Sequence, residues 1–558
     1  MRERVALHAT AAVVMVLVLA PLIAPGYVLS YDMVFVPHQP LRWDLVAPTG
    51  ALPRAVPQDA VVSTLSQIVP GWLLQRLALG GAIYAAALGA GRLVPTAGVL
   101  PRVIVALTYA WTPFLAERLL LGQWGLLLAY GALPWLVSAA NGVRQQRPGA
   151  LPRLILPAAV SAITPTGGLI ALVTTVVLTM GRRPARTAIA ATAAVTLLNA
   201  PWLVAAALTA AGGRSDADGV AAFAARAENW SGVYGAILGT GGVWNALTTP
   251  GSRASVFAPL VTAVLLTLGA IGFPRLLRRW PGGAATRLAA VAAGSVVVAL
   301  AGTTVLSAQG LTWLVGSVPG AGLLRDGQKF LIPYALLLSL CVGLGAERIG
   351  ERLPSMVSRA VLVAVVIVPV AALPDLAWGA AGQLRPVSYP ADWERVSEAV
   401  AAAPGDVLSL PFDLYRAPPW NRGRPVIDPT PRYLPAPVVV DDTLRVGSIV
   451  VNGEDARAAR VRQALARGDL TDLDDIRWVV LHKDAGGVVE SGALDTLRLA
   501  YDGQFLALYA NPGYTVHAAS GGPHRWVILI AYLLAVGVIV AAIWHFAASL
   551  PRGNVRHV

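Results

Sequence analysis

The sequence predicts a polytopic α-helical membrane protein of about 12 transmembrane helices that carries a small α/β extracytoplasmic domain. Its 558 residues are 56% hydrophobic and only 13% charged, about half the charged fraction of a typical soluble domain. The apolar residues gather in several runs of about 20, the length that crosses the hydrocarbon core of a bilayer. Most arginines lie in the short connections between these runs. The net charge of +13 therefore reflects membrane topology and does not indicate nucleic-acid binding.

Twelve apolar runs account for the predicted helices. They lie near 8–29, 70–91, 98–113, 119–140, 154–164, 166–181, 187–211, 255–274, 288–308, 330–346, 360–379 and 526–549. The stretch 154–181 is interrupted by 'TPTGG' at 164–168, and proline disrupts a helix interior. This stretch is either one kinked helix or two short helices that cross twice or form a re-entrant pair.

Arginine placement favours two crossings in 154–181. Lys and Arg are enriched in cytoplasmic connections, and clusters occur within 144–153, 182–186, 275–279, 348–359 and 552–556. All five share one side only if 154–181 crosses twice, which gives 12 spans with both termini in the cytoplasm. The strong bias to Arg, with Lys329 and Lys483 as the only lysines, is typical of GC-rich bacteria. We therefore expect a multi-pass protein of a bacterial plasma membrane.

This topology predicts three parts. Residues 1–379 form the transmembrane bundle with outer loops 30–69, 212–254 and 309–329, residues 380–525 form the α/β domain, and residues 526–558 form the last helix and a cytoplasmic tail. The 380–525 segment contains 'DVLSLPF', 'APVVVDD', 'IRWVVLHKD' and 'FLALYAN', which are strand-like runs rich in β-branched residues. Helical patterns at 392–403, 454–467 and 490–500 separate them, and a segment of this size can bury its own core.

The first outer loop holds a candidate catalytic carboxylate. Asp32 lies a few residues beyond the first helix, close to the membrane surface, where ionisable residues are costly and often functional. It could take a proton from an acceptor hydroxyl as a general base, although an Asp that orders the loop explains the same position. His38, Asp44 and Asp59 follow in the loop as candidate substrate-binding residues, and either Asp44 or Asp59 could replace Asp32 as the base.

A second polar cluster lies between the third and fourth helices, in 'WTPFLAERLLLGQWG'. Glu117 and Arg118 are candidate substrate contacts, but a snorkelling pair at the membrane interface explains them equally well. Gln123 and Trp124 place an amide beside a flat apolar ring, which suits a sugar. A tryptophan of the interfacial belt is the alternative for Trp124.

A third cluster, 'GLLRDGQKFLIPY', marks the entry of an outer loop into a late helix. Arg325 and Lys329 are candidate phosphate-binding residues, because Arg offers a planar fork and Lys a point charge. Asp326 and Gln328, between them, are candidate substrate-binding residues. A basic pair on the outer side runs against the positive-inside bias, so topology alone does not account for it.

With these three motifs, the chain resembles polytopic glycosyltransferases of the GT-C superfamily. It looks most similar to the membrane portion of actinobacterial arabinofuranosyltransferases and to their YfhO-like relatives. The resemblance rests on the first-loop Asp32, on 'ERLLLGQWGLLLAYGALPW', on 'RDGQKF' and on the plan of many helices with an outer C-terminal domain. The resemblance implies a GT-C-like bundle and transfer of a sugar, arabinofuranose or mannose, from a polyprenyl-phosphate donor to an envelope glycan or glycolipid on the outer face.

The resemblance also implies roles for individual residues. Asp32 matches the catalytic carboxylate of the first loop, and Arg325 and Lys329 match positions that engage the donor phosphate. Many members have two adjacent acidic residues in that loop, whereas Asp32 has no acidic neighbour. This departure leaves open which carboxylate is the base and whether a divalent cation assists, since no metal ligands are identified.

Two other functions compete with the glycosyltransferase. A transporter or flippase of lipid-linked glycans would show inverted repeats with matching broken helices and a site at the midplane, but the sequence has one broken pair and its polar clusters lie at the outer edge. A non-catalytic scaffold for envelope assembly would keep the bundle and have no need of Asp32. The sequence contains no Walker loop, dinucleotide fingerprint, HExxH or GxSxG motif, which argues against the enzyme classes that use them.

Overall fold

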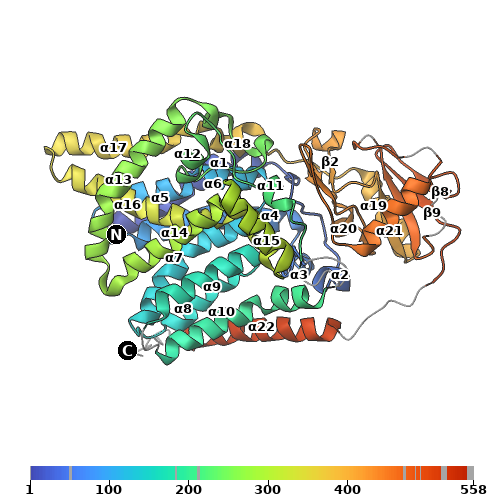
Figure 1. The fold of residues 1–558 in the computed structure, drawn as a ribbon, viewed down its shortest axis with the longest axis horizontal. Helices are drawn as coiled ribbons and strands as arrows, with labels where there is room; N and C mark the ends of the chain where they lie inside the picture. Colours follow the sequence, from blue (N-terminus) through green and yellow to red (C-terminus); the bar gives the residue numbers. More distant parts are fainter. Residues whose placement is uncertain are drawn as a thin grey trace, which may run out of the picture.

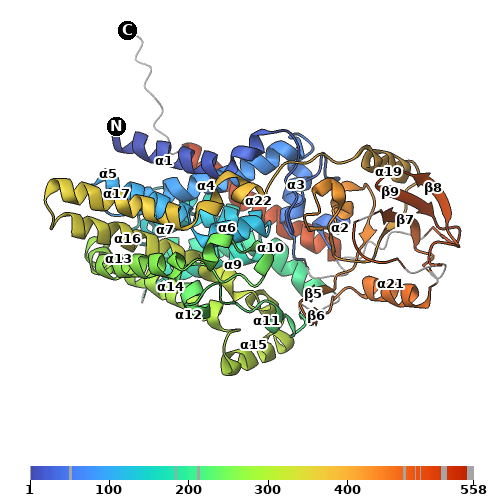
Figure 2. The same cartoon turned by 90° about the horizontal axis from the view of Figure 1, so that it is seen from above.

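The protein is a bundle of long helices with an α/β unit at one end (Figure 1). The computed structural model describes residues 2–48, 53–181, 185–209, 214–468, 470, 473–483, 485–489, 492–516 and 524–548. The long helices run in roughly the same direction, and the α/β unit continues the long axis of the molecule in both perpendicular views (Figures 1 and 2).

Nine helical segments within the described residues are long and apolar enough to cross a membrane. They are α1 with η1 (Arg2–Leu19, Ala20–Ile23), α4 (Gly71–Leu93), α5 with α6 (Val99–Ala110, Pro113–Leu120), α7 (Trp124–Arg144), α10 (Arg186–Leu208), α13 (Phe257–Arg279), η6 with α16 (Gly327–Leu331, Ile332–Gly350), α17 (Ser355–Ala372) and α22 (His524–Ala548). The chain is therefore a multi-pass membrane protein, as predicted.

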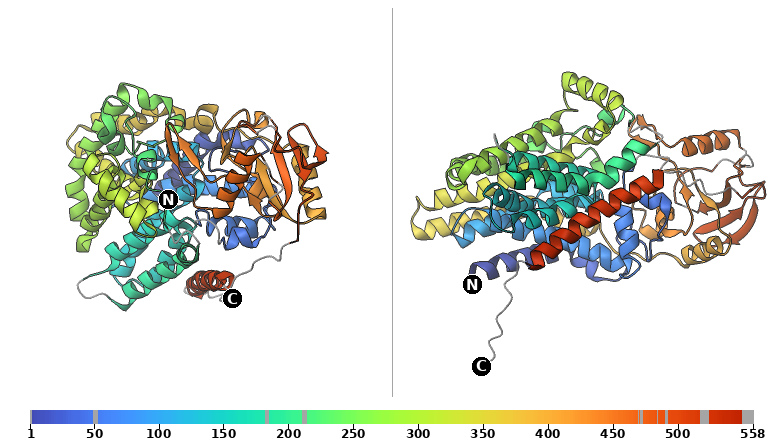
Figure 3. Two further views of the ribbon diagram at one scale, coloured as in Figure 1. Left: turned by 45° about the vertical axis from the view of Figure 1, so that its right-hand side comes forward. Right: turned by 90° about the horizontal axis from the view of Figure 1, so that it is seen from below.

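Burial separates the inner helices from those that face the surroundings. In α7, 78% of the residues in the most apolar stretch are buried, against 22% in α22. The helix α22 packs along α10 at the edge of the bundle, and both helices lie at the surface (Figure 3). The described ends of the chain, the start of α1 and the end of α22, lie at the end of the bundle away from the α/β unit (Figure 1). An even number of crossings would give this arrangement, and which side faces the cytoplasm stays a prediction.

The predicted break in 154–181 separates two helices, α8 (Ala150–Ser161) and α9 (Pro165–Thr179). The Thr164 hydroxyl accepts a hydrogen bond from the Gly167 amide at 3.2 Å, and Pro165 occupies the first helical position, where its missing N–H costs nothing. A 12-residue helix is only about 18 Å long, shorter than the hydrocarbon core. Whether the pair crosses twice therefore remains a prediction.

The predicted span 288–308 is wrong at its C-terminal end. The helix α14 (Ala284–Leu300) stops early, and the chain turns by 92° into α15 (Val305–Ser317). The helix α15 covers the end of the predicted span and continues into the segment predicted as the outer loop 309–329. Gly302 and two β-branched threonines weaken the helix there, and the Thr304 hydroxyl accepts a hydrogen bond from the Ser307 amide as the cap of α15. The helix α15 lies at the outside of the bundle (Figure 2).

The α/β unit is built on a five-stranded sheet with strand order β4-β1-β7-β9-β8. Its strands are β1 (Asp406–Leu410), β4 (Val438–Val439), β7 (Ile476–His482), β8 (Arg498–Asp502) and β9 (Leu506–Ala510). The strands β4, β1 and β7 are parallel, whereas β9 and β8 continue the sheet antiparallel. The four predicted strand segments all contain a strand, and the helices predicted at 392–403 and 454–467 are α19 (Ala391–Ala402) and α21 (Ala456–Arg467).

The helix predicted at 490–500 is wrong. Residues 490 and 491 lie outside the described residues, residues 492–496 form turns, and after a bend at 497 the segment enters β8. The strands β8 and β9 form an antiparallel pair, so pairing with β9 decides the structure of a segment whose local pattern also suits a helix.

The first outer loop joins the α/β unit to the bundle. Tyr27 pairs with Val387 in an antiparallel bridge, and Tyr31 pairs with Val426 in the short strand β3 (Val426–Ile427). The loop also contains two short helices, α2 (Trp43–Val46) and α3 (Gln58–Leu65). Because of these two bridges, residues that follow α1 meet residues 360 and 395 positions later in the chain.

Candidate functional site

The backbone around Asp32 is held between the α/β unit and the turn that follows α6. The Tyr31 amide donates to the Pro425 carbonyl at 2.7 Å, and the Asp32 amide donates to the Leu121 carbonyl at 3.1 Å. Gly122 makes this approach possible: its φ is +78°, and a Cβ there would lie 2.1 Å from the Ser30 carbonyl oxygen. The glycine of the 'LGQW' motif is thus required for the first loop to reach this turn.

The Asp32 carboxylate receives one hydrogen bond from each side of this junction. Gln123 Nε2, at the start of α7, donates to Oδ2 at 3.1 Å. Tyr415 Oη, in β2 (Tyr415–Arg416) of the α/β unit, donates to Oδ1 at 2.6 Å. Burial, followed by the charge of Asp32, raises the pKa of Tyr415 well above its usual value, so this hydroxyl stays a donor at neutral pH. Asp32 is partly exposed, and a carboxylate has about four acceptor positions, so it can still accept from a third hydroxyl.

A buried ion pair continues the network from Gln123. Arg118 has a fully buried side chain, and its Nη1 donates to Gln123 Oε1 at 2.8 Å. The guanidinium also binds Asp326 with both nitrogens, each at 3.0 Å from one carboxylate oxygen. This two-pronged geometry is the strongest form of the Arg–carboxylate pair. Burial alone would raise the pKa of Asp326, but the charges of Arg118 and Lys329 outweigh it, and the pKa is lowered.

Lys329 forms the exposed end of the network. Its Nζ lies 3.3 Å from Asp326 Oδ2, and its side chain is 27% exposed, against 0% for Arg118. Polar contacts therefore run without a gap from Asp32 through Gln123, Arg118 and Asp326 to Lys329. Both Arg118 and Lys329 contact the Asp326 carboxylate at this end, and only the Lys329 side chain is partly exposed, so Lys329 is the cation of this network that an anion from outside can reach.

Glu117 and Gln328 extend the hydrogen-bonded network on the buried side of Arg118. Glu117 Oε2 accepts from Gln328 Nε2 at 3.0 Å and from the Val243 amide at 3.3 Å. Gln328 also accepts a hydrogen bond from Arg118 through its Oε1. Glu117 and Arg118 are both fully buried, so the alternative of a snorkelling interface pair is wrong.

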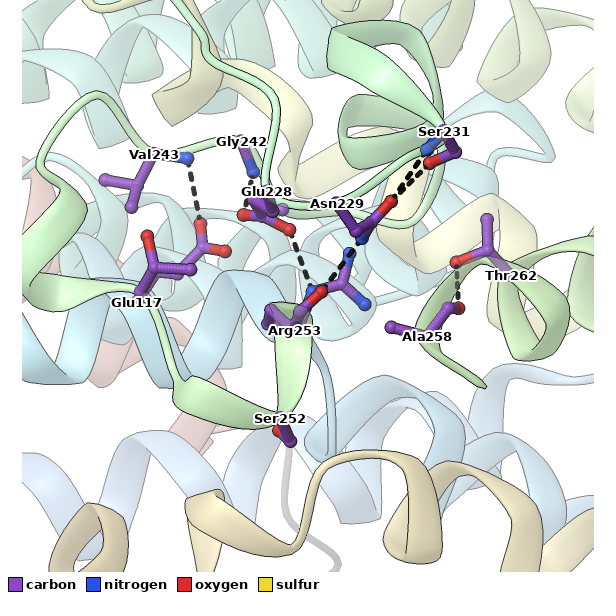
Figure 4. Close-up of polar contacts among 12 residues, drawn as sticks. Glu117, Glu228, Asn229, Ser231, Gly242, Val243, Ser252, Arg253, Ala258 and Thr262 are labelled. Carbon is purple, nitrogen blue, oxygen red and sulfur yellow. Dashed lines mark hydrogen bonds and ion pairs between the residues drawn. The ribbon is translucent and has the colours of Figure 1, made fainter. Parts of the chain in front are cut away.

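A second carboxylate, Glu228, lies beside Glu117 (Figure 4). It accepts from Arg253 Nε at 2.8 Å and from the Gly242 amide at 2.5 Å. A Cβ at Gly241 would lie 2.6 Å from the Glu228 oxygens and 2.9 Å from Glu117 Oε1, so only glycine fits between the two carboxyl groups. The hydrogen bond from the Val243 amide to Glu117 joins the predicted outer loop 212–254 to α6. No group of three His, Cys, Asp or Glu side chains placed to hold a metal ion occurs within the described ranges.

Arg325 lies outside this hydrogen-bonded network. Its guanidinium stacks over the Phe223 ring at 5.0 Å, and burial and the charge of Arg54 lower its pKa to about 10. In the described part of the chain, no hydrogen bond or ion pair joins Arg325 to Asp32, Gln123, Arg118 or Asp326.

The other predicted residues have separate contacts. Trp124 is 6% exposed and its ring packs on Phe35 with a centroid distance of 4.9 Å, so it offers no open face to a sugar. Three loop residues each bind a partner outside the Asp32 network: His38 with the Ser66 carbonyl at 3.1 Å, Asp44 with Arg42 at 2.7 Å, and Asp59 with Arg432 at 3.0 Å.

Sequence reasoning missed Tyr415 because no local signal identifies it. It stands 383 positions from Asp32, in a segment with no catalytic motif. Glu228 and Arg253 were missed for a related reason, because their loop is long and lacks a periodic pattern. The Tyr31 backbone pairing with β3 brings Tyr415 to Asp32, and only the folded chain reveals that pairing.

Solved structures share this fold. The sequence matches no protein-family profile and no curated protein. The structure is similar to a cryo-EM structure of the arabinofuranosyltransferase AftD from Mycobacteria, with a TM-score of 0.56 and 18% identity over 90% of this chain. Two structures of an AftD mutant match with TM-scores of 0.56 and 0.54. The chain therefore has a fold similar to that of AftD, and it spans 40% of the length of that AftD chain.

Proposed function

We propose that the protein is a membrane glycosyltransferase that moves a sugar from a polyprenyl-phosphate donor to an envelope glycan or glycolipid. The observation that carries the proposal is the continuous polar connection from Asp32 to Lys329, through Gln123, Arg118 and Asp326, in a chain whose fold is similar to that of AftD. It pairs a carboxylate that can accept a proton with a cation that can hold a phosphate, which are the two groups that this transfer requires.

The proposed reaction is a direct displacement at the anomeric carbon of the donor. The acceptor hydroxyl gives its proton to Asp32 while its oxygen attacks that carbon. The bond between the anomeric carbon and the phosphate oxygen breaks, and the polyprenyl phosphate leaves with its electron pair. Lys329, with Arg325 as a second cation, stabilises the negative charge that develops on the leaving phosphate. The anomeric configuration is inverted, and no covalent enzyme intermediate forms.

Tyr415 and Gln123 hold the base in this scheme. Both donate to the Asp32 carboxylate, which fixes its orientation toward the acceptor. Arg118 is fully buried and acts as a positioning residue, because it binds both Gln123 and Asp326. The donor enters from the bilayer with its lipid chain between helices, and the acceptor approaches from the side of the α/β unit, which we assign to the extracytoplasmic face.

Transfer assays in membranes test the proposal. Membranes that contain the wild-type protein or Asp32→Ala are supplied with radiolabelled polyprenyl-phosphate arabinose or mannose and an acceptor glycan extract. We expect the wild type to transfer one of the two sugars and Asp32→Ala to lose the transfer. Equal transfer by both proteins contradicts the role of Asp32, and no transfer from either donor contradicts the proposed donor class and supports a scaffold or a transporter.

A further inference from the structure

A separate cavity of about 480 Å³ lies where the α/β unit meets the bundle. Its lining includes Tyr31 of the first loop, Gln383 and Arg385 after α17, and Arg422 and Arg424 before β3. Asp32, Arg325 and Lys329 are not part of this lining, so the cavity is distinct from the proposed donor site, although Tyr31 is next to Asp32 in the chain.

The cavity wall is strongly basic. Three of its lining residues are arginines, none is Asp or Glu, and no described carboxylate forms an ion pair with Arg385, Arg422 or Arg424. Guanidinium groups that line the same cavity without a carboxylate beside them repel one another. A bound anion would remove that repulsion, whereas water alone would only screen it.

Arg424 is held by neutral partners only. It donates to the Ser30 hydroxyl at 2.8 Å, the Gln383 side-chain oxygen at 3.2 Å and the Leu120 carbonyl at 3.3 Å, and its guanidinium lies 5.9 Å from the centre of the Tyr31 ring. The group is half-buried, and its positive charge is fixed in place without a counter-charge.

Arg385 and Arg422 complete the basic wall from two other segments. Both side chains are exposed, so a ligand from the surroundings can reach them. Arg422 has a φ of +57°, a conformation that is rare for a residue with a side chain, and its amide donates to the Pro419 carbonyl at 2.8 Å. The chain thus places an arginine at a strained turn position that glycine or asparagine would occupy more readily.

The cavity lies near the ends of two candidate membrane spans. Leu29, which lines it, follows the span Arg2–Ile23, and Gln383 follows the span Ser355–Ala372. The apolar side chain of Leu247 also lines the cavity and is 73% exposed. A basic wall beside an exposed leucine, close to span ends, suits a headgroup at the membrane surface.

We propose that this cavity binds a phosphate group, carried either by an anionic phospholipid headgroup at the membrane surface or by a soluble phosphate. The planar fork of arginine matches two phosphate oxygens at once, and three guanidinium groups on one wall can hold a phosphate from several directions. The site is additional to the phosphate site proposed at Lys329 and does not depend on transferase activity.

The test uses the full-length protein in two arms. In the first arm, native mass spectrometry counts phosphatidylglycerol that the protein retains from nanodiscs of phosphatidylcholine and phosphatidylglycerol. In the second, inorganic phosphate is titrated into protein in phosphatidylcholine nanodiscs. Both arms compare Arg385→Gln/Arg422→Gln with the charge-matched control Arg445→Gln/Arg498→Gln, in a Lys329→Gln background that removes the proposed donor-phosphate contact.

We expect the cavity variant, Arg385→Gln/Arg422→Gln, to weaken phosphate or phosphatidylglycerol binding at least tenfold. The control variant, Arg445→Gln/Arg498→Gln, should leave binding unchanged. If the cavity variant loses binding of phosphatidylglycerol only, the natural ligand is a lipid headgroup. If it loses binding of inorganic phosphate only, the natural ligand is a soluble phosphate. No binding in either arm, or equal binding by the cavity and control variants, overturns the proposal. A third variant, Arg424→Lys, keeps the charge but loses the fork, and we expect it to weaken binding in the same arm.

Discussion

The Tyr415 hydroxyl donates a hydrogen bond to Asp32 Oδ1 at 2.6 Å, across a sequence separation of 383 residues. Asp32 belongs to the first loop of the bundle, and Tyr415 belongs to the α/β unit. The α/β unit therefore contributes directly to the surroundings of the candidate base. The backbone pairing of Tyr31 with Val426 in β3 sets the position of the neighbouring Asp32.

Replacing Tyr415 tests whether this hydrogen bond positions the base. Tyr415→Phe removes only the hydroxyl, and a hydrogen bond to a charged group contributes about 1.5–3 kcal/mol. We expect kcat for sugar transfer to fall about tenfold or more, with little change in KM for the donor, as measured by steady-state kinetics. The matched control is Tyr501→Phe, whose hydroxyl binds Asp392 at 2.8 Å and which should keep the wild-type kcat.

A double-mutant cycle separates this role from a general effect on folding. If Tyr415 acts through Asp32, Tyr415→Phe has no further effect on the residual rate of Asp32→Asn. Additive losses would show that Tyr415 influences the rate by another route.

Lys329 provides a test of phosphate binding with an internal control. Lys329→Gln removes the exposed cation of the network, and we expect KM for the polyprenyl-phosphate donor to rise about tenfold, an energy of about 1.4 kcal/mol. Lys329→Arg should recover part of the loss because it keeps the charge. The other lysine, Lys483, pairs with Asp502 in the α/β unit, so Lys483→Gln should leave KM unchanged. Equal donor KM values for Lys329→Gln and Lys483→Gln would exclude the phosphate role.

The pair of Arg118 and Asp326 should matter for stability. Arg118→Met leaves Asp326 buried without its main partner, and breaking a buried pair costs about 3–5 kcal/mol. We expect a large drop in the unfolding temperature of the detergent-solubilised protein. The exposed Arg278→Met should change stability by less than about 0.5 kcal/mol. A double variant, Arg118→Met/Asp326→Leu, should be more stable than Arg118→Met alone, and the opposite order would contradict the role of the buried charge.

A buried His–Asp pair in the α/β unit predicts a loss of stability in acid. Burial and the charge of Arg416 lower the pKa of His482 to about 3, and Thr430 Oγ1 lies 2.9 Å from its Nε2. Between pH 6.5 and about 3, the unfolded histidine binds a proton that the folded one excludes. The free energy of unfolding therefore falls by up to about 1.4 kcal/mol for each pH unit as the pH is lowered.

Asp428 adds to this effect at lower pH. Burial alone would raise its pKa, but Arg416 and His482 lower it below its usual value. Its stabilising contribution is therefore present above its unfolded pKa of about 3.9 and is lost as the pH falls below that. Hydrogen exchange of the amides in β1 and β7, measured on the full-length protein at several pH values from 7 to 4.5, checks the histidine effect. His482→Gln should flatten the pH dependence, and an unchanged dependence would contradict the assignment.

Much of the fold was predictable because apolar runs long enough to span a bilayer, and the Pro–Gly breaks between them, are encoded by residues that are neighbours in the sequence. The break before Pro165 follows from the threonine cap and the proline, and both belong to the same five residues. The 92° turn between α14 and α15 was not predicted, because the apolar pattern continues through it. The strand β8 was not predicted either, since only its pairing with β9 distinguishes it from a helix.

The candidate site was predictable only in part, for a similar reason. The motifs around Gln123 and Lys329 are compact, and the structure connects them through Arg118 and Asp326. Tyr415 depends on a backbone pairing across the whole chain. Trp124 was misjudged because an aromatic next to a polar motif looks the same whether it is open or packed against Phe35.

The most direct test of the central proposal compares two carboxylates of the same loop. Asp32→Asn and Asp44→Asn each replace a carboxylate by an amide of the same shape, and Asp44 lies outside the hydrogen-bonded network. The measurement is the rate of sugar transfer by the purified full-length protein at saturating donor and acceptor. We predict that Asp32→Asn slows transfer at least about 100-fold, as expected for the loss of a general base, while Asp44→Asn stays within about twofold of the wild type. Transfer at the wild-type rate by Asp32→Asn would contradict the proposed role of Asp32 as the base.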